Sequence, residues 1–211
     1  MYVRKEKNVM RLDKIKLFLV LTAMVCLSGC ASVPFAEGPD VTSLRSYADT
    51  PTWVVQEVTD SREDEKAGRI GLLMQTVVKS SDLTKNVTDN LVYTLNSQER
   101  INVLRVQGND PAVIAGQFIS KNISGILSAK VKAVKVSSLD ILIPVKSEMT
   151  MELVLYDPLG RELFMKTIFA KSPKGILPTT PTQEKEMIGS VITEMMRMIA
   201  EDQEIHQILF R

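Results

Sequence analysis

Residues 145–171, with the sequence VKSEMTMELVLYDPLGRELFMKTIFAK, decide the fold. Their first half alternates, with one parity made of Val145, Met149, Met151, Leu153 and Leu155 and the other of Lys146, Glu148, Thr150, Glu152 and Tyr156. Residues 157–160 (DPLG) then place proline second and glycine fourth, which is the pattern of a tight turn. The stretch therefore predicts a β-hairpin, with strands over 145–156 and 161–171, that buries one face and leaves the other in water.

Shorter runs of β-branched and apolar residues before this hairpin predict the remaining strands. These runs are 52–59, 70–74, 101–106 and 123–136. Residues 60–68 (DSREDEKAG), between the first two runs, are predicted as a charged loop.

Apolar residues that recur every three or four positions predict three helices. The first follows a capping sequence at Ser81-Asp82, ends near residue 97 and carries the stripe Leu83, Val87, Leu91 and Leu95. The second starts with Asp110 at the N-cap and Pro111 at the first helical position, and ends near residue 121. The third starts with a capping box at 180–183 (TPTQ) and carries the stripe Met187, Ile188, Val191, Ile192, Met195, Met198 and Ile199. A last short element is expected over 205–210.

Strands and helices are partly segregated along the chain, which is typical of an α+β fold. We expect a mainly antiparallel sheet packed against two or three helices, with a long C-terminal helix. A length of 211 residues suits one such domain.

The composition excludes several classes of function. A formal net charge of +1 argues against a broad surface for nucleic acid. One His and two Cys rule out most His/Cys metal sites and any framework of several disulfides. We find no glycine-rich phosphate loop and no dinucleotide-binding motif in the sequence, so no cofactor and no metal are expected.

The first thirty residues have the pattern of an export signal. Residues 1–16 hold six basic residues and two acidic ones, and an apolar run of 11 residues follows over 17–27. This run has signal-peptide length and is too short to span a bilayer as a stable helix. A start at Met10 would give a more compact basic region, and the sequence does not decide between Met1 and Met10.

The apolar run ends in Leu27-Ser28-Gly29-Cys30, which resembles the bacterial lipobox. The resemblance implies that signal peptidase recognises Leu27, Ser28 and Gly29, and that the thiol of Cys30 accepts a diacylglyceryl group. Cleavage would free the amine of Cys30 for a further acyl chain. Each buried methylene contributes about 0.8 kcal/mol, so two or three chains hold a protein on a membrane far more firmly than one. An ordinary signal peptide with an incidental Cys is the alternative.

The residues after Cys30 suggest where the protein is sent. Ala31-Ser32 follows, and in lipoproteins of Gram-negative bacteria an Asp at this place favours retention in the inner membrane. The resemblance therefore implies the outer membrane, on its periplasmic face. We predict a signal peptide over 1–29, an acylated Cys and flexible tether over 30–51, and one periplasmic domain over 52–211.

The remaining residues with chemical potential favour structural roles. His206 is expected to be a surface or satisfied histidine, and the acidic residues Asp60, Glu63, Asp64 and Glu65 a solvated loop rather than a cation site, because Arg62 and Lys66 interleave with them. A wet strand face is expected for Lys130, Lys132 and Lys135, with contact to an anionic headgroup or peptidoglycan as the alternative. Core packing is expected for the methionines of the last helix, Met187, Met195, Met196 and Met198, with an adaptable binding surface as the alternative.

The order of these features resembles the YajG-like lipoproteins of Gram-negative bacteria. The features are a lipobox, a strand ending in Asp60-Ser61-Arg62, a following Ile70-Gly71, a helix, a meander and a long C-terminal helix. The resemblance covers most of the chain after Cys30. It implies an outer-membrane lipoprotein of poorly defined role, with no catalytic residues to carry over.

Two functions are compatible with this sequence, and an enzyme is not expected. The first is a non-catalytic component of the cell envelope, held in the membrane by acyl chains on Cys30, that binds another envelope protein through a sheet edge or helix face. The second is an auxiliary lipoprotein that handles lipid or glycan for an envelope transporter. An apolar cavity between the sheet and the last helix would favour the second, and a filled core with a bare apolar strand edge would favour the first.

Overall fold

The computed structural model describes residues 30–32, 39–42, 44–70, 74–108, 110–119, 121–138, 146–172 and 181–211. The predicted signal peptide, with Leu27, Ser28 and Gly29, lies outside the described residues. Thr180, the predicted cap of the last helix, also lies outside them.

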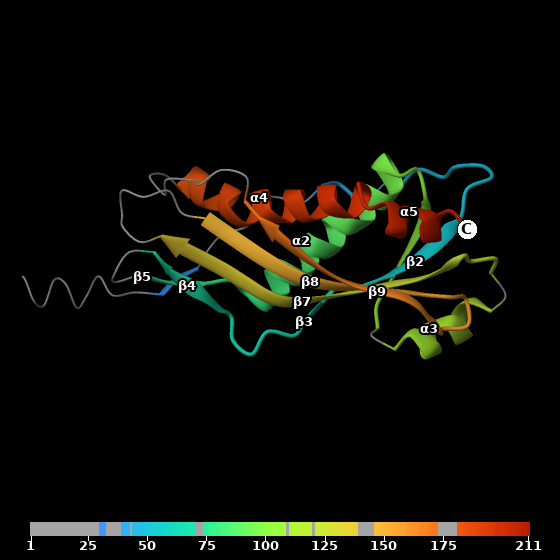
Figure 1. Cartoon of the computed structure of the whole chain (residues 1–211), viewed down its shortest axis with the longest axis horizontal. Helices are drawn as coiled ribbons and strands as arrows, with labels where there is room; N and C mark the ends of the chain where they lie inside the picture. Colours follow the sequence, from blue (N-terminus) through green and yellow to red (C-terminus); the bar gives the residue numbers. More distant parts are fainter. Residues whose placement is uncertain are drawn as a thin grey trace, which may run out of the picture.

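The described strands join one open, mixed sheet (Figure 1). They are β1 (Cys30–Ser32), β2 (Thr52–Gln56), β3 (Thr59–Asp60), β4 (Lys66–Ile70), β5 (Met74–Val77), β6 (Asn102–Val106), β7 (Gly125–Ser138), β8 (Lys146–Tyr156) and β9 (Glu162–Lys171). Strand β7 is the centre of the sheet. On one side it pairs with β8, and on the other it pairs in turn with β2, β3 and β4. Beyond these strands, β9 extends from β8, β6 from β2, and β5 and β1 from β4.

The helices cover the two faces of the sheet unequally (Figure 1). They are α2 (Ser80–Tyr93), continued by the π-helical η1 (Thr94–Gln98), then α3 (Pro111–Phe118), α4 (Pro181–Ala200) and α5 (Gln203–Leu209). Residues of α2, α4 and α5 share one large hydrophobic cluster with the sheet, whereas α3 belongs to a smaller cluster around Val54 and Ile126. We call the face that packs on α2 and α4 the inner face, and the opposite one the outer face.

The α+β fold with a long C-terminal helix is confirmed. The longest pairings, β7–β8 and β8–β9, are antiparallel, as the hairpin pattern predicts. However, β2 pairs in parallel with both β6 and β7, so the sheet is mixed. The parallel pairing follows from the connections between the strands. Helix α2 lies between β2 and β6 in the chain, and α3 lies between β6 and β7. Helical connections of this kind let successive strands run in the same direction.

The predicted hairpin is formed by β8 and β9 and is closed by the side chain of Asp157. One carboxylate oxygen of Asp157 accepts hydrogen bonds from the backbone N–H groups of Leu159 and Arg161, both at 2.9 Å. Gly160 has a φ of +80°, which favours glycine, and a Cβ there would lie 3.1 Å from the carbonyl oxygen of Pro111. The turn sequence therefore shapes the hairpin and lets α3 approach it.

Three local predictions need correction. Helix α2 has Lys79 at its N-cap with no side-chain hydrogen bond, so Ser81-Asp82 does not cap it. Helix α3 starts at Pro111 with Asp110 as its cap, as predicted, but ends at Phe118. The predicted charged loop over 60–68 ends early, because Lys66 to Gly68 belong to β4. A bulge between Lys66 and Gly68 interrupts the regular alternation of side chains along β4, so the sequence pattern did not predict the start of this strand.

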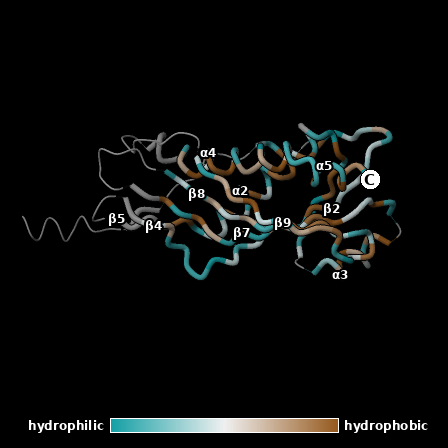
Figure 2. Tube along the Cα trace, in the orientation of Figure 1, coloured by the Kyte–Doolittle hydropathy of each residue, from teal (hydrophilic) through white to brown (hydrophobic). Residues whose placement is uncertain are grey.

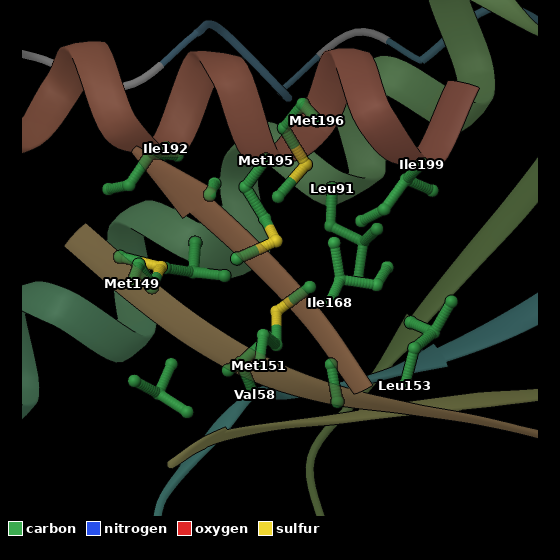
Figure 3. Packing of buried hydrophobic residues seen from close by; sticks show 14 of the residues in the cluster. Val58, Leu91, Met149, Met151, Leu153, Ile168, Ile192, Met195, Met196 and Ile199 are labelled. Atoms are coloured by element: carbon green, nitrogen blue, oxygen red, sulfur yellow. The ribbon is translucent and has the colours of Figure 1, made fainter. Parts of the chain in front are cut away.

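The core lies between the inner face and α4 (Figure 3). Figure 3 shows Met195 and Met196 reaching from α4 toward Met149 and Met151 of β8. These four side chains are at most 4% exposed. The apolar parity of β8 therefore faces the core, as the alternation predicts.

Candidate functional site

The backbone of Cys30, the predicted acylation site, begins strand β1. This strand runs parallel to β5, with Cys30 opposite Gln75 and Ser32 opposite Val77. The sheet thus reaches the first residue of the predicted mature chain. Acylation of Cys30 stays a prediction.

Part of the segment predicted as a tether is fixed to the domain by two buried or half-buried amides. Asn96 accepts from the backbone N–H of Arg45 at 2.9 Å and donates to its carbonyl at 2.8 Å. Asn102 makes the same pair of bonds with the backbone of Tyr47, both at 2.8 Å. Because four hydrogen bonds hold this stretch, residues 44–50 differ from the flexible tether expected there.

The acidic cluster divides into a buried pair and an exposed loop. Arg62 and Asp60 form an ion pair of 2.6 Å, with side chains 5% and 7% exposed, and Arg62 also donates to the carbonyl of Val78. Burial of the Asp60 carboxyl opposes its ionisation, but hydrogen bonds from Arg62 outweigh burial and hold its pKa below the usual value. The expectation of a solvated loop is therefore wrong for Asp60 and Arg62, which tie β3 to the start of α2.

The other acidic residues of this cluster fit the expected solvated loop. Glu63, Asp64 and Glu65 are exposed, and Asp64 pairs with Lys66 at 3.1 Å. Within the described part of the chain, no group of three His, Cys, Asp or Glu residues is placed to hold a metal ion.

The three strand lysines lie on exposed parts of β7. Lys132 pairs with Glu152 at 3.1 Å, and it lines an open groove together with Lys135, Lys66 and Glu148. Lys130 and Lys135 are exposed and have no ion pair among the described residues. The structure therefore places these three lysines on a solvent-exposed part of the strand, as expected.

His206 lies on the surface of α5. Its side chain is 52% exposed, its Nε2 atom lies 3.6 Å from a carboxylate oxygen of Glu99, and its ring centroid lies 4.5 Å from that of Phe210. These contacts are those of a surface histidine, as expected.

The methionines of α4 pack in the core. Met187, Met195 and Met196 are buried, and Met198 is partly buried against the same cluster. Together with Ile192 and Ile199 they occupy the space in which a lipid-handling protein would need a cavity (Figure 3). The structure therefore places these methionines in a packed interior.

Strand β9 is an edge strand with an apolar outer face. Among the described residues it pairs only with β8. Its inner residues Ile168 and Ala170 are buried, whereas Leu163, Met165 and Phe169, on the opposite parity, are 51%, 51% and 47% exposed. On this parity only Thr167 separates the three large apolar side chains, and such a set beside an open edge is a feature of sites that bind another protein.

The sequence contained a signal for this surface that the hairpin prediction did not use. The strand over 161–171 has apolar residues on both parities, such as Phe164 and Ile168 on one and Leu163 and Met165 on the other. Figure 2 shows α4 and α5 beside the sheet and α3 at one end of its other side. Among the described residues, no helix therefore covers most of the outer face of β9.

No helix of the described residues combines the length and apolar character needed to cross a membrane. No protein-family model matches the chain, and no curated protein matches it in sequence.

Several solved structures overlap with part of this chain. PelC, a dodecamer from Paraburkholderia phytofirmans, is 14% identical with a TM-score of 0.47, covering 75% of this chain and 92% of that one. A minor lipoprotein from Acinetobacter baumannii is 13% identical with a TM-score of 0.41, covering 74% and 92% of the two chains. Lipoprotein GNA1162 from Neisseria meningitidis is 10% identical with a TM-score of 0.40, covering 68% and 96%. All of these TM-scores lie below 0.5, so the overlaps identify neither a family nor a function.

Proposed function

We propose that this chain is a lipid-anchored lipoprotein of the outer membrane, facing the periplasm, that acts as a non-catalytic binding component of the cell envelope. The lipobox at Leu27 to Cys30 supports the anchor, and Ala31-Ser32 supports the outer membrane. The resemblance to YajG-like lipoproteins, carried by Asp60-Ser61-Arg62 and Ile70-Gly71, supports the same class.

The edge of β9, which no other strand of the described residues covers, is the observation that carries the binding role. An unpaired strand offers backbone N–H and C=O groups to an extended segment of another chain. On the outer face beside it, Leu163, Met165 and Phe169 offer apolar area for the side chains of that segment. The expected partner is another envelope protein.

The interior supports binding at the surface rather than carriage of lipid or glycan. The side chains between α4 and the sheet are buried, and those of Ile188, Val191 and Met195 have no exposed area. A carrier would need an apolar cavity in this layer, and the structure fills it with side chains.

Site-specific crosslinking in intact cells tests this function. A photoreactive amino acid is placed at Met165, and a control at Thr193, which is exposed on α4. We expect one envelope protein to be captured reproducibly from Met165 and not from Thr193, and to be identified by mass spectrometry. Capture of lipid or peptidoglycan alone at Met165, or equal capture from both positions, would contradict the proposal.

A further inference from the structure

The pairing registers place Cys30 in one row of the sheet with a solvent-exposed lysine. Cys30 is opposite Gln75 of β5, Gln75 is opposite Arg69 of β4, Arg69 is opposite Ser137 of β7, and Ser137 is opposite Lys146 of β8. Four strand spacings of about 4.8 Å therefore separate the backbones of Cys30 and Lys146, or about 19 Å. An acyl anchor at Cys30 would hold this end of the sheet close to the membrane surface.

Two lysines at this end lie on the protein surface. Lys146 and Lys135 are exposed and form no ion pair among the described residues. Their basic neighbours Lys171 and Lys66 are already paired, with Glu148 and Asp64 respectively, both at 3.1 Å. Lys146 lies in the same row as Cys30 and Lys135 lies two rows from it, so both positive charges are close to the predicted anchor.

The opposite end of the hairpin is far from this row. Strand β8 runs from Lys146 to Tyr156, which at about 3.3 Å per residue gives about 33 Å. The turn with Leu159 follows it, on the side where Figure 1 shows α3 and the C-terminus. The molecule therefore has one end near Cys30 and one end well away from it.

We propose that the end of the sheet formed by β1, β5, β4 and the adjoining ends of β7 and β8 lies against the bilayer, with Lys135 and Lys146 in contact with anionic headgroups. This inference rests on the proposed acylation of Cys30. Lysines close to an anionic membrane each strengthen binding about fivefold at moderate ionic strength. The geometry directs the turn at Leu159, helix α3 and the distal part of β9 away from the membrane, where another protein can reach them.

Energy transfer from the protein to labelled headgroups measures this orientation. The acylated protein from cells is placed in vesicles of phosphatidylcholine with phosphatidylglycerol that carry a headgroup acceptor dye. A donor dye is attached to Glu186→Cys or to Leu159→Cys. Glu186 is exposed and precedes Met187, whose carbonyl accepts from Ser147 beside Lys146, so it marks the near end. The mature chain has no other free thiol if Cys30 is acylated.

We expect clearly higher transfer from residue 186 than from residue 159. We also expect transfer from 186 to fall when phosphatidylglycerol is left out, and in the variant Lys135→Glu/Lys146→Glu. The variant Lys121→Glu/Arg211→Glu makes the same change in net charge at exposed positions elsewhere, and should behave as the parent.

The possible failures are distinguishable. If the protein floats with the vesicles but residue 159 transfers as much as residue 186, the orientation is wrong and the anchor stands. If energy transfer from residue 186 is high but changes neither with phosphatidylglycerol nor in either double variant, the proposed contact of the lysines with headgroups is wrong. If the protein does not float with either kind of vesicle, the anchor fails and the orientation fails with it.

Discussion

The indole N–H of Trp53 donates a hydrogen bond of 3.0 Å to the backbone carbonyl of Leu209, and so joins β2 to α5 across 156 positions of sequence. The Trp53 side chain is 1% exposed. Gly125 makes room for it, since a Cβ there would lie 2.5 Å from the ring. The bond secures the last helix to β2.

Trp53→Phe removes this bond and part of the ring, and leaves a buried carbonyl without its donor. We expect a loss of about 2 kcal/mol in the free energy of unfolding, measured by urea titration. Tyr93→Phe, at a residue that is 40% exposed, is the control and should change it little. An equal effect of the two substitutions would show that the bond does not stabilise the fold.

The buried pair of Asp60 and Arg62 predicts a dependence of stability on pH. Hydrogen bonds from Arg62 lower the folded-state pKa of Asp60 below its unfolded value. The stabilisation is therefore complete above the unfolded value of about 3.9, and it is lost as the pH falls through the lower folded value. Asp60→Asn should flatten the decline of unfolding free energy below about pH 4.

The same substitution also leaves Arg62 buried without its partner at neutral pH. We expect Asp60→Asn to cost about 3 kcal/mol at pH 7. Asp64→Asn serves as the control, because it disrupts only an exposed ion pair with Lys66. The unfolding midpoint of this variant should match that of the parent protein. Parallel pH profiles for the parent and Asp60→Asn would contradict the assignment.

The methionines of α4 offer a test of the packed interior. Met195 is fully buried, whereas Met198 is only partly buried against the same cluster. Met195→Ala should lower the free energy of unfolding by about 3 kcal/mol, and Met198→Ala by clearly less. Similar small losses at both positions would indicate a loosely filled layer and would revive the role in lipid handling.

Charge on the outer face of β9 should abolish binding without unfolding the protein. Met165 and Phe169 are about half exposed, so Met165→Lys/Phe169→Lys should leave the urea midpoint nearly unchanged. Crosslinking to the partner, from a photoreactive residue at Leu163, should be lost in this double variant. Thr193→Lys on α4 should retain it. Undiminished crosslinking in the double variant would place the binding surface elsewhere.

Local patterns in the sequence were sufficient for much of the fold. The turn at Asp157 to Gly160, the cap at Asp110 and the stripe of α4 each depend on residues a few positions apart, and each is formed as expected. The parallel pairing of β2 with β7 was not predictable in this way. It depends on the route that the chain takes between strands, which periodicity does not record.

The unpredicted parts of the candidate site depend on contacts between distant positions. Asn96 and Arg45 are 51 positions apart, so nothing local marks residues 44–50 as fixed. Arg62 and Asp60 are close in sequence, but Arg62 also donates to the carbonyl of Val78, which is 16 positions away. The apolar outer face of β9 was visible in the sequence, yet only the structure shows that no neighbouring strand pairs with its edge among the described residues.

Acylation of Cys30 is the central claim, because the membrane location, the orientation and the place of the partner all depend on it. The most direct measurement compares the parent with Cys30→Ala in cell fractions washed with high salt, followed by immunoblotting. We predict that the parent sediments with outer membranes and that Cys30→Ala does not. A Cys30→Ala protein that still sediments with the membranes after washing would contradict the account.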